Sequence, residues 1–201
     1  MLQFREDMME MKTIAVVGSG DPGRRIAYTS CLAGFRTILE DISPSALEQA
    51  IAWIRQALGE GISRGEISIS DRDGALRNLH TANSAEDASR EADLIMETVS
   101  DEMEMKIELF TIFDKFAKPG AIFASTTTSL RITDLAAVTF RPERCIGMRF
   151  FTDRKTTGRL ELVKGRETSE ETVAACREVG RRMGLEVSLP GEQTMTARSG
   201  E

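Results

Sequence analysis

TIAVVGSGDPG, residues 13–23, joins a short apolar run to three closely spaced glycines. The run Thr13–Val17 is typical of a buried strand, and Gly18, Gly20 and Gly23 have the G-x-G-x-x-G spacing. In a dinucleotide-binding βαβ unit the first glycine permits a tight turn and the second lets the backbone approach a pyrophosphate. The third lets the helix pack on the strand, and the helix N-terminus attracts phosphate. The stretch therefore predicts a nucleotide-binding turn rather than a glycine-rich loop without a ligand.

A carboxylate follows the second strand that such a unit requires. Arg36–Glu40 is another largely apolar run, and Asp41 comes directly after it, close to the spacing of about 20 residues expected from the glycines. A carboxylate at this position accepts hydrogen bonds from the ribose hydroxyls of NAD, and it repels the 2′-phosphate of NADP. The pattern favours NAD as the cofactor.

Two residues inside the glycine turn depart from the usual pattern. Pro22 has no N–H, so one potential phosphate donor is absent. Asp21 brings a carboxylate to the anion site, where we expect it to cap the following helix while Arg24 and Arg25 offset its charge. Both changes predict weaker cofactor binding.

Strand-like and helix-like segments alternate along most of the chain. The apolar periodicity predicts strands over 13–17, 36–40, 80–82, 94–99, 121–124, 145–150, 159–163 and 185–189. It predicts helices over 22–33, from 43 to about 58, and over 103–116, 131–138 and 170–183, with a loop or short helical hairpin over 59–74. This order indicates a doubly wound, Rossmann-type α/β domain over 12–189 whose mainly parallel sheet is covered on both faces. We expect a flexible leader over 1–11 and a polar tail over 190–201.

The composition argues against several classes of protein. The 201 residues are 41% hydrophobic and 29% charged, as in an ordinary globular domain, and the net charge of -6 argues against a nucleic-acid-binding face. No apolar run is long enough to span a membrane, and the first residues lack the apolar part of a secretory signal. We expect a cytoplasmic protein with neither nucleic-acid nor membrane partners.

The cysteines and the single histidine do not have the spacing of a metal site. Cys31, Cys145 and Cys176 lie far apart, and His80 is the one histidine of the chain. We expect no bound metal and three buried free thiols, as is usual in a reducing compartment.

Four further blocks, in order, resemble the NAD-binding domain of the 3-hydroxyacyl-CoA dehydrogenases. They are ADLIMETV (92–99) with Glu104 and Lys106, AIFASTTTSL (121–130), RPERCIGMRFF (141–151) and LELVKG (160–165). The resemblance extends from about residue 12 to 191 and implies a Rossmann domain that binds NAD beside an acyl substrate. It implies a cofactor site that comprises Gly18, Gly20, Asp21, Pro22, Gly23, Asp41, Thr98, Lys106 and Thr128.

The resemblance also implies where the catalytic residues lie. The family uses a histidine that takes the proton of the substrate hydroxyl and a glutamate that orients this histidine. These positions are Arg149 and Glu161 here, and Thr128 matches the serine that holds the substrate oxygen. Arginine stays charged at physiological pH, so Arg149 cannot be a general base. His80 lies in a segment that the family does not use for catalysis, and we expect a structural or surface role for it.

Two interpretations of Arg149 remain open. In the first, Arg149 and Glu161 form a structural ion pair in an abandoned site. In the second, Arg149 binds a substrate carboxylate, or stabilises the alkoxide formed when a carbonyl is reduced, with Thr128 or water supplying the proton. The second predicts an NAD-dependent oxidoreductase with a histidine-free site, acting on a β-hydroxy or β-keto acyl thioester or a related small acid. The first predicts an inactive nucleotide-binding or scaffolding partner of another protein.

The resemblance further implies a helical domain that is not found after Pro190-Gly191. In the family that domain closes the substrate cleft and forms the dimer, whereas residues 192–201 are too few to form it here. Thr152 and Asp153 also replace an asparagine and a proline of the family's pattern. We therefore expect a homodimer or a partner protein to cover the open cleft, in which the substrate is a CoA thioester, a carrier-protein thioester or a small acid.

Overall fold

An eight-stranded sheet forms the centre of the computed structural model, which describes residues 11–151 and 158–189. The strand order is β3-β2-β1-β4-β5-β6-β7-β8, and all neighbours are parallel except β6 and β7. The strands are β1 (Thr13–Val17), β2 (Arg36–Glu40), β3 (Leu79–Ala82), β4 (Leu94–Glu97), β5 (Ile122–Ser125), β6 (Cys145–Phe151), β7 (Arg159–Lys164) and β8 (Glu186–Ser188).

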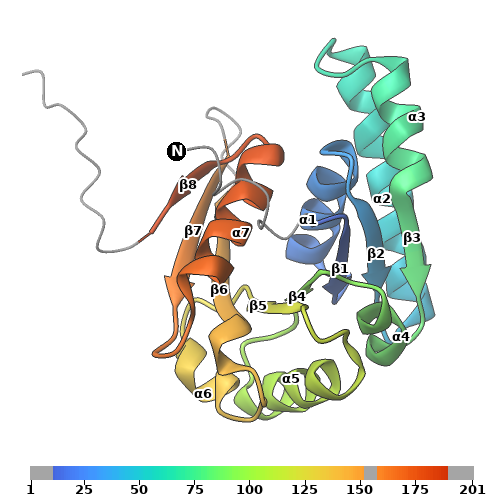
Figure 1. Cartoon of the computed structure of the whole chain (residues 1–201). Coiled ribbons are helices and arrows are strands. Elements are labelled where there is room, and N and C mark those ends of the chain that lie inside the picture. The colour runs from blue at the N-terminus through green and yellow to red at the C-terminus, as the bar shows by residue number, and fades with distance from the viewer. Residues whose placement is uncertain (1–10, 152–157, 190–201) are drawn as a thin grey trace, which may run out of the picture.

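Helices cover both faces of this sheet, as Figure 1 shows. They are α1 (Asp21–Leu32), α2 (Pro44–Ser63), α3 (Ile69–Asn78), α4 (Ala85–Arg90), α5 (Met103–Phe116), α6 (Ile132–Ala136) and α7 (Glu170–Arg182). Ile14 and Val16 of β1 pack with α1, α2, α3 and α7, whereas Ala15 and Val17 pack on the opposite face with α4, α5 and α6. Successive side chains of a strand point to opposite faces, so a central strand buried on both must be apolar throughout. The prediction of a doubly wound, mainly parallel sheet is confirmed.

The stretch over 59–74 is a helical hairpin rather than a loop. Helix α2 continues through Gly59 and Gly61 to Ser63, and α3 begins after Ser68, whose hydroxyl accepts from the N–H of Asp71 while the Asp71 carboxylate accepts from the N–H of Ser68. A Cβ on Gly61 would lie 3.2 Å from the side chain of Ile67, so glycine at this position lets Ile67 pack closely on α2. Of the glycines that suggested irregularity, Gly61 therefore serves close packing and Gly65 has φ +72° between the two helices, whereas a Cβ on Gly59 would meet nothing within 4 Å.

One short helix and the end of one strand differ from the sequence predictions. Helix α4 was not predicted, because its six residues carry too few apolar positions for a helical period. Its start is nevertheless encoded by Ser84, whose side chain accepts from the N–H of Asp87. Strand β4 ends at Glu97 rather than Val99, since the Val99 N–H bonds to the Glu97 carboxylate instead of a neighbouring strand.

The predicted leader was drawn one residue too long. Met11 is buried, with 4% of its surface exposed, and its carbonyl accepts from Arg182 Nη1 at 2.9 Å. The rest of the leader, the tail over 190–201, and Thr152 and Asp153 lie outside the described residues. Within the described ranges, none of the helices combines the length and the apolar character that crossing a membrane requires.

The three cysteines are buried free thiols, as predicted. Burial raises the pKa of the Cys31, Cys145 and Cys176 thiols to about 12 in each case. His80 lies exposed on the edge strand β3. These residues therefore serve packing or lie at the surface, and the polar groups of interest gather elsewhere.

The carboxyl ends of β1, β2, β4 and β5 lie at one edge of the sheet because these strands are parallel. The chain reverses its strand order between β1 and β4, which are neighbours in the sheet but far apart in sequence. In open α/β sheets ligands bind at such a switch point, outside the carboxyl ends of the strands. The glycine turn after β1 lies there.

Candidate functional site

The glycine turn, residues 18–23, is shaped by contacts that exclude any side chain at two of its glycines. Gly18 has φ +101°, and a Cβ on Gly23 would lie 1.9 Å from the Gly18 carbonyl oxygen. By contrast, a Cβ on Gly20 would meet nothing closer than Pro22, at 3.9 Å. The turn thus packs tightly against the protein at Gly18 and Gly23 and leaves open space beside Gly20, which fits the approach of a pyrophosphate.

Thr98 supports this turn from behind. Its hydroxyl reaches the carbonyls of Val17, at 3.0 Å, and of Gly18, at 2.8 Å, and the residue is 7% exposed. Thr98 therefore holds the turn in place and offers little surface to a ligand.

Asp41 lies at the end of β2 and faces the turn. Its carboxylate accepts from the N–H and the hydroxyl of Ser19, at 2.8 and 2.7 Å, and from the N–H of Ser43, at 2.9 Å. Burial alone would raise the pKa of Asp41, but the hydrogen bonds from Ser19 and Ser43 outweigh it and hold the pKa below its usual value. The half-buried carboxylate is ionised at neutral pH, as binding ribose hydroxyls requires.

Ser19 escaped the sequence analysis, although it fixes Asp41 through both its backbone and its side chain. Ile42, the neighbour of Asp41, is 91% exposed and was also not singled out. The available signal was their place in the motif: Ser19 is a variable position of the glycine pattern, and Ile42 follows its carboxylate. Neither position has a required residue type in that pattern, so residue type did not identify Ser19 or Ile42 as a site residue.

Asp21 does not cap α1, contrary to the expectation. Gly20 is the N-cap residue, and no side chain accepts from the first helical N–H groups. Asp21 instead pairs with Arg25, at 2.8 Å, and Arg24, at 2.7 Å, and these arginines hold its pKa below the usual value. It is the first residue of the helix, and its partners lie one turn further along α1. The expected compensation of the Asp21 charge by Arg24 and Arg25 is confirmed. Pro22 lies in the first turn of α1, where it contributes no N–H.

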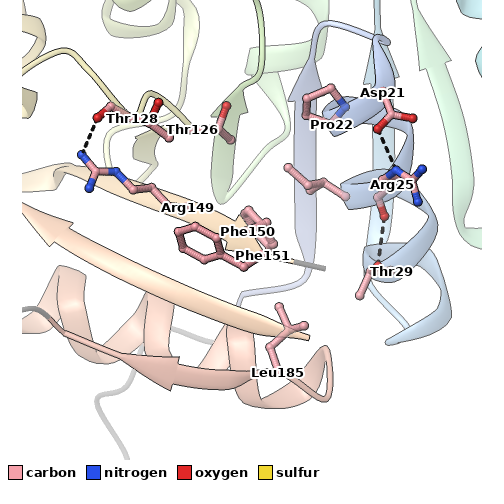
Figure 2. A pocket seen from close by; sticks show the side chains of 11 residues that line it. Asp21, Pro22, Arg25, Thr29, Thr126, Thr128, Arg149, Phe150, Phe151 and Leu185 are labelled. Carbon is pink, nitrogen blue, oxygen red and sulfur yellow. Dashed lines mark hydrogen bonds and ion pairs between the residues drawn. The ribbon is translucent and has the colours of Figure 1, made fainter. Parts of the chain in front are cut away.

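A groove of about 500 Å³ separates α1 from the end of β6. Figure 2 shows residues of α1 on one side and Arg149, Phe150 and Phe151 on the other. The lining residues are Asp21, Pro22, Arg25, Ile26, Thr29, Thr126, Thr128, Arg149, Phe150, Phe151 and Leu185. The groove therefore brings both unusual residues of the glycine turn together with two of the three predicted catalytic residues.

Arg149 is held by three acceptors. Its Nε donates to the Thr127 carbonyl at 2.9 Å, its Nη2 to the Thr128 carbonyl at 3.4 Å, and its Nη1 to Glu161 at 3.1 Å. Arg149 and Glu161 are direct partners of the antiparallel pair β6–β7, which explains why they meet. Their side chains are 23% and 25% exposed. These contacts use three of the five N–H donors of the guanidinium, and the cation stays at the groove.

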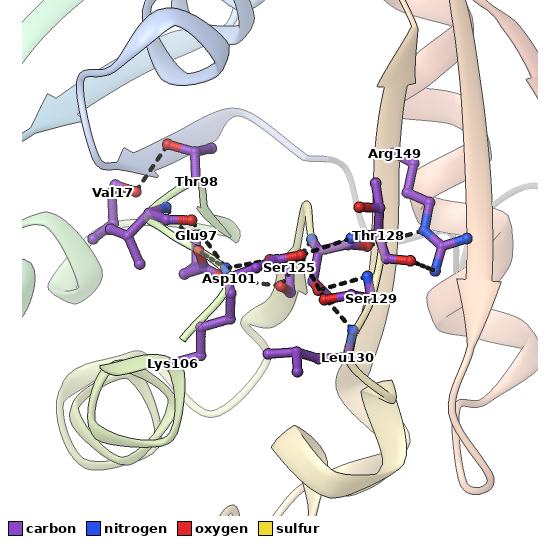
Figure 3. Close-up of polar contacts among 12 residues, drawn as sticks. Val17, Glu97, Thr98, Asp101, Lys106, Ser125, Thr128, Ser129, Leu130 and Arg149 are labelled. Atoms are coloured by element: carbon purple, nitrogen blue, oxygen red, sulfur yellow. Dashed lines mark hydrogen bonds and ion pairs between the residues drawn. The ribbon is translucent and has the colours of Figure 1, made fainter. Parts of the chain in front are cut away.

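Lys106 is fully buried, so its ammonium does not reach the open groove in this arrangement. It lies 2.5 Å from Glu97, with both side chains 0% exposed, and 3.3 Å from Asp101 (Figure 3). Glu97 also accepts from the Ser125 hydroxyl, at 2.7 Å. Burial raises the pKa of Glu97, and the Lys106 ammonium opposes that rise.

The partners of Lys106 were missed in the sequence. Glu97 lies within one of the four family-like blocks and Asp101 lies outside them, and neither was a predicted site residue. A signal existed at Glu97, because a carboxylate that ends a wholly apolar strand must find a partner. The sequence did not say that this partner is Lys106.

Glu40 is a second buried carboxylate beside the site, and its burial predicts a pH-dependent effect on stability. It is 5% exposed, and burial, with the nearby charges of Asp41 and Glu86, raises its pKa to about 7. The folded protein therefore holds this proton more tightly than the unfolded chain, so stability falls as pH rises from about 4.5 to 7. We expect Glu40→Gln to raise the free energy of unfolding at pH 8, by up to about 3 kcal/mol, and to have little effect at pH 4.5. Urea denaturation at both pH values measures this.

The matched control is the exposed Glu48→Gln on α2. It should change stability by less than about 0.5 kcal/mol at either pH. An equal effect of Glu40→Gln at pH 4.5 and pH 8 would contradict a proton-linked origin.

Comparison with known proteins identifies the domain. The family described as "3-hydroxyacyl-CoA dehydrogenase, NAD binding domain" matches residues 13–189. This range contains the glycine turn, the groove and the buried pair of Glu97 and Lys106. The match bears out the resemblance inferred from the four sequence blocks.

Individual relatives agree with this match. A 3-hydroxybutyryl-CoA dehydrogenase of Bradyrhizobium diazoefficiens is 34% identical over 179 residues, which are 89% of this chain and 61% of that protein. The crystal structure of (S)-3-hydroxybutyryl-CoA dehydrogenase from Ralstonia eutropha superposes with a TM-score of 0.84 at 29% identity, covering 90% of this chain and 63% of that one. The enzyme of the same name from Escherichia coli gives a TM-score of 0.85 at 30% identity, covering 90% and 38%. The chain thus spans less than two thirds of the length of these relatives.

Proposed function

Because this chain belongs to the 3-hydroxyacyl-CoA dehydrogenase family and contains its NAD-binding domain, we propose that it is an NAD-dependent oxidoreductase with a histidine-free site. The proposed substrate is a β-keto or β-hydroxy acyl thioester of CoA or a carrier protein, or a related small acid. Relatives named for 3-hydroxybutyryl-CoA and 3-hydroxyadipyl-CoA support this class of substrate.

The residues at the switch point fit the cofactor. The open side of Gly20 would receive the pyrophosphate, and the ionised Asp41 would accept from the adenosine ribose. The exposed Ile42 offers an apolar surface for the adenine. When bound, NAD accepts a hydride and NADH supplies one.

Arg149 carries the proposal because it places a permanent cation at the groove. As a substrate carbonyl gains a hydride, its oxygen becomes an alkoxide, and the N–H donors of Arg149 outside its three contacts would stabilise that charge. The hydroxyl of Thr128, which lines the same groove, would pass a proton to the oxygen and recover one from water. Arg149 moves no proton itself.

The described residues of the groove do not include a strong general base. Oxidation needs a base that takes the hydroxyl proton. Among the described residues of the groove, Asp21 is the one carboxylate, and Arg24 and Arg25 hold its pKa below the usual value. Such a carboxylate is a weak base, so the proposed proton path runs through Thr128 in either direction of the reaction.

A second candidate function is nucleotide binding without chemistry. It is favoured by the close pairing of Arg149 with Glu161 and two backbone carbonyls, as in a structural ion pair. In either case we propose that a second copy of this chain or a partner protein covers the groove. Phe151 at the groove is 40% exposed, and an apolar side chain there is suited to such a contact.

Substitution of Arg149 separates these functions. We expect the wild-type protein to oxidise NADH with acetoacetyl-CoA, and Arg149→Met to lower kcat roughly 100-fold to 1,000-fold through loss of alkoxide stabilisation. Absorbance at 340 nm measures the rate, and Arg131→Met, at an 81% exposed arginine, is the control. Turnover that is absent in the wild type and arises only in Arg149→His would favour the inactive nucleotide-binding partner.

A further inference from the structure

We propose that the buried pair of Glu97 and Lys106 joins the glycine turn to the loop that carries Thr128, and so sets the position of the cofactor relative to the substrate. Glu97 and Lys106 are positioning residues in this proposal. Figure 3 shows the network, which spans two loops that follow neighbouring strands. We call residues 97–101 the linking segment and residues 126–130 the Thr128 loop.

One end of the linking segment grips the glycine turn. The Thr98 hydroxyl donates toward the carbonyls of Val17 and Gly18, and the Thr98 N–H donates to the Val17 carbonyl at 2.9 Å. A Cβ on Gly18 would lie 2.9 Å from the Thr98 hydroxyl. A shift of Thr98 would therefore shift the turn on which the pyrophosphate is expected to lie.

The buried pair holds the middle of the linking segment from both sides. Glu97 accepts from the Val99 N–H at 2.8 Å, and Lys106 donates to the Val99 carbonyl at 3.1 Å. Both polar groups of one residue are thus fixed by the two members of an ion pair that has 0% exposure. Buried hydrogen-bonded networks of this kind restrict a loop to one arrangement.

The other end of the network grips the Thr128 loop. Lys106 pairs with Asp101, whose carboxylate accepts from the Ser129 hydroxyl at 2.9 Å and the Thr128 N–H at 3.3 Å. Glu97 accepts from Ser125 at the start of this loop. The loop in turn supplies the Thr128 carbonyl to Arg149. The contacts therefore run without interruption from Gly18 to Arg149.

This arrangement gives Lys106 a positioning role at the cofactor site. Hydride transfer requires the reacting atoms to lie about 3–3.5 Å apart, so small displacements between the two halves of the site are costly. A network that fixes both halves controls the rate of the chemical step more than the affinity for either ligand. The kinetic part of this inference rests on the proposed oxidoreductase function.

Cutting the outer link tests the kinetic part. We expect Asp101→Asn and Ser129→Ala each to lower kcat with NADH and acetoacetyl-CoA roughly 10-fold to 100-fold while KM for NADH stays unchanged. The double variant should be no worse than the stronger single one, since Ser129→Ala removes a contact of Asp101 that Asp101→Asn already weakens. Asp73→Asn on α3, which breaks an ion pair with Arg72, is the control and should leave kcat unchanged. A rise in KM with kcat retained, or additive losses, would overturn the proposal.

Hydrogen exchange tests the coupling without activity. ADP lacks the nicotinamide half of NAD, so we expect it to contact the glycine turn and the Asp41 region, and slower exchange in the Thr128 loop would then be transmitted through the protein. In the wild type we expect ADP to slow amide exchange in the glycine turn and in the Thr128 loop. In Glu97→Gln/Lys106→Met we expect ADP to slow exchange in the glycine turn alone. Equal slowing of the Thr128 loop in both proteins, or none in the wild type, would overturn the proposal. If transmission is seen but the wild type has no turnover, the oxidoreductase function fails and the coupling stands.

Discussion

Alanine at position 23 is expected to weaken NADH binding strongly and to destabilise the fold. A Cβ on Gly23 would lie 1.9 Å from the Gly18 carbonyl oxygen and 2.7 Å from the Thr98 hydroxyl. Backbone cannot yield as a flexible side chain can, so α1 must move away from the strand. We expect the free energy of unfolding to fall by about 2 kcal/mol or more, as for an overpacked core. The affinity for NADH should fall on the order of 100-fold, because the phosphate-binding N–H groups move with the helix.

Two other glycines separate the effect on binding from the effect on stability. Gly20→Ala adds a methyl group where nothing lies within 3.9 Å, so the fold should keep its stability while the pyrophosphate is obstructed. Gly59→Ala, inside α2 with nothing within 4 Å, should stabilise the protein by about 0.5–1 kcal/mol and leave binding unchanged. Calorimetric titration with NADH and thermal unfolding measure both quantities. NADH binding retained in Gly23→Ala would refute the assignment of the glycine turn.

Removal of the Lys106 ammonium is expected to cost about 3–5 kcal/mol of stability. Lys106→Met keeps the length and apolar stem of the side chain but leaves the Glu97 carboxylate, 0% exposed, without its cation. Native domains are stable by only about 5–15 kcal/mol, so the variant should unfold at far lower denaturant concentration. The loss should shrink at low pH, where Glu97 takes up a proton and no longer needs a counter-charge.

The second partner provides the decisive comparison. In Glu97→Gln/Lys106→Met neither member of the buried pair is charged, so we expect most of the stability lost in Lys106→Met to return. The control is Lys115→Met on the same helix, where the lysine is exposed and a change below about 1 kcal/mol is expected. Urea denaturation at pH 5 and pH 8 measures all three. Equal stability of Lys106→Met and the wild type at pH 8 would mean that the buried pair contributes nothing net.

Local pattern was sufficient for most of the fold. Strands β1 and β2 and helix α5 have the predicted bounds, because an apolar run or a helical period between clear turn residues is a local property. The same holds for the glycine turn, whose positive φ at Gly18 and close contact at Gly23 are the reasons that glycine is required. Asp41 is equally local, since its place at the end of β2 follows from where that strand stops.

The arrangement of the polar groups was not available in this way. Asp21 was expected to cap α1 because its residue type suits a cap, but the structure gives that position to Gly20 and pairs Asp21 with two arginines. Lys106 stays a predicted residue of the cofactor site, and the sequence did not indicate that its ammonium is buried against Glu97. Which partner each of these side chains takes depends on the neighbours that compete for the same hydrogen bonds. The residue type alone does not determine which neighbour is bound.

The chain's own pattern of residues thus establishes a doubly wound nucleotide-binding domain, and the family match confirms it. It also establishes that position 149 carries a permanent cation where a base would be expected. Folding adds that this cation is fixed by the Thr127 and Thr128 carbonyls and by Glu161, which lie 22, 21 and 12 positions away. Periodicity and turn chemistry act over a few residues, whereas these contacts require strands β5, β6 and β7 to be brought side by side. For that reason the type of domain could be inferred from the chain alone, and the geometry of its polar site could not.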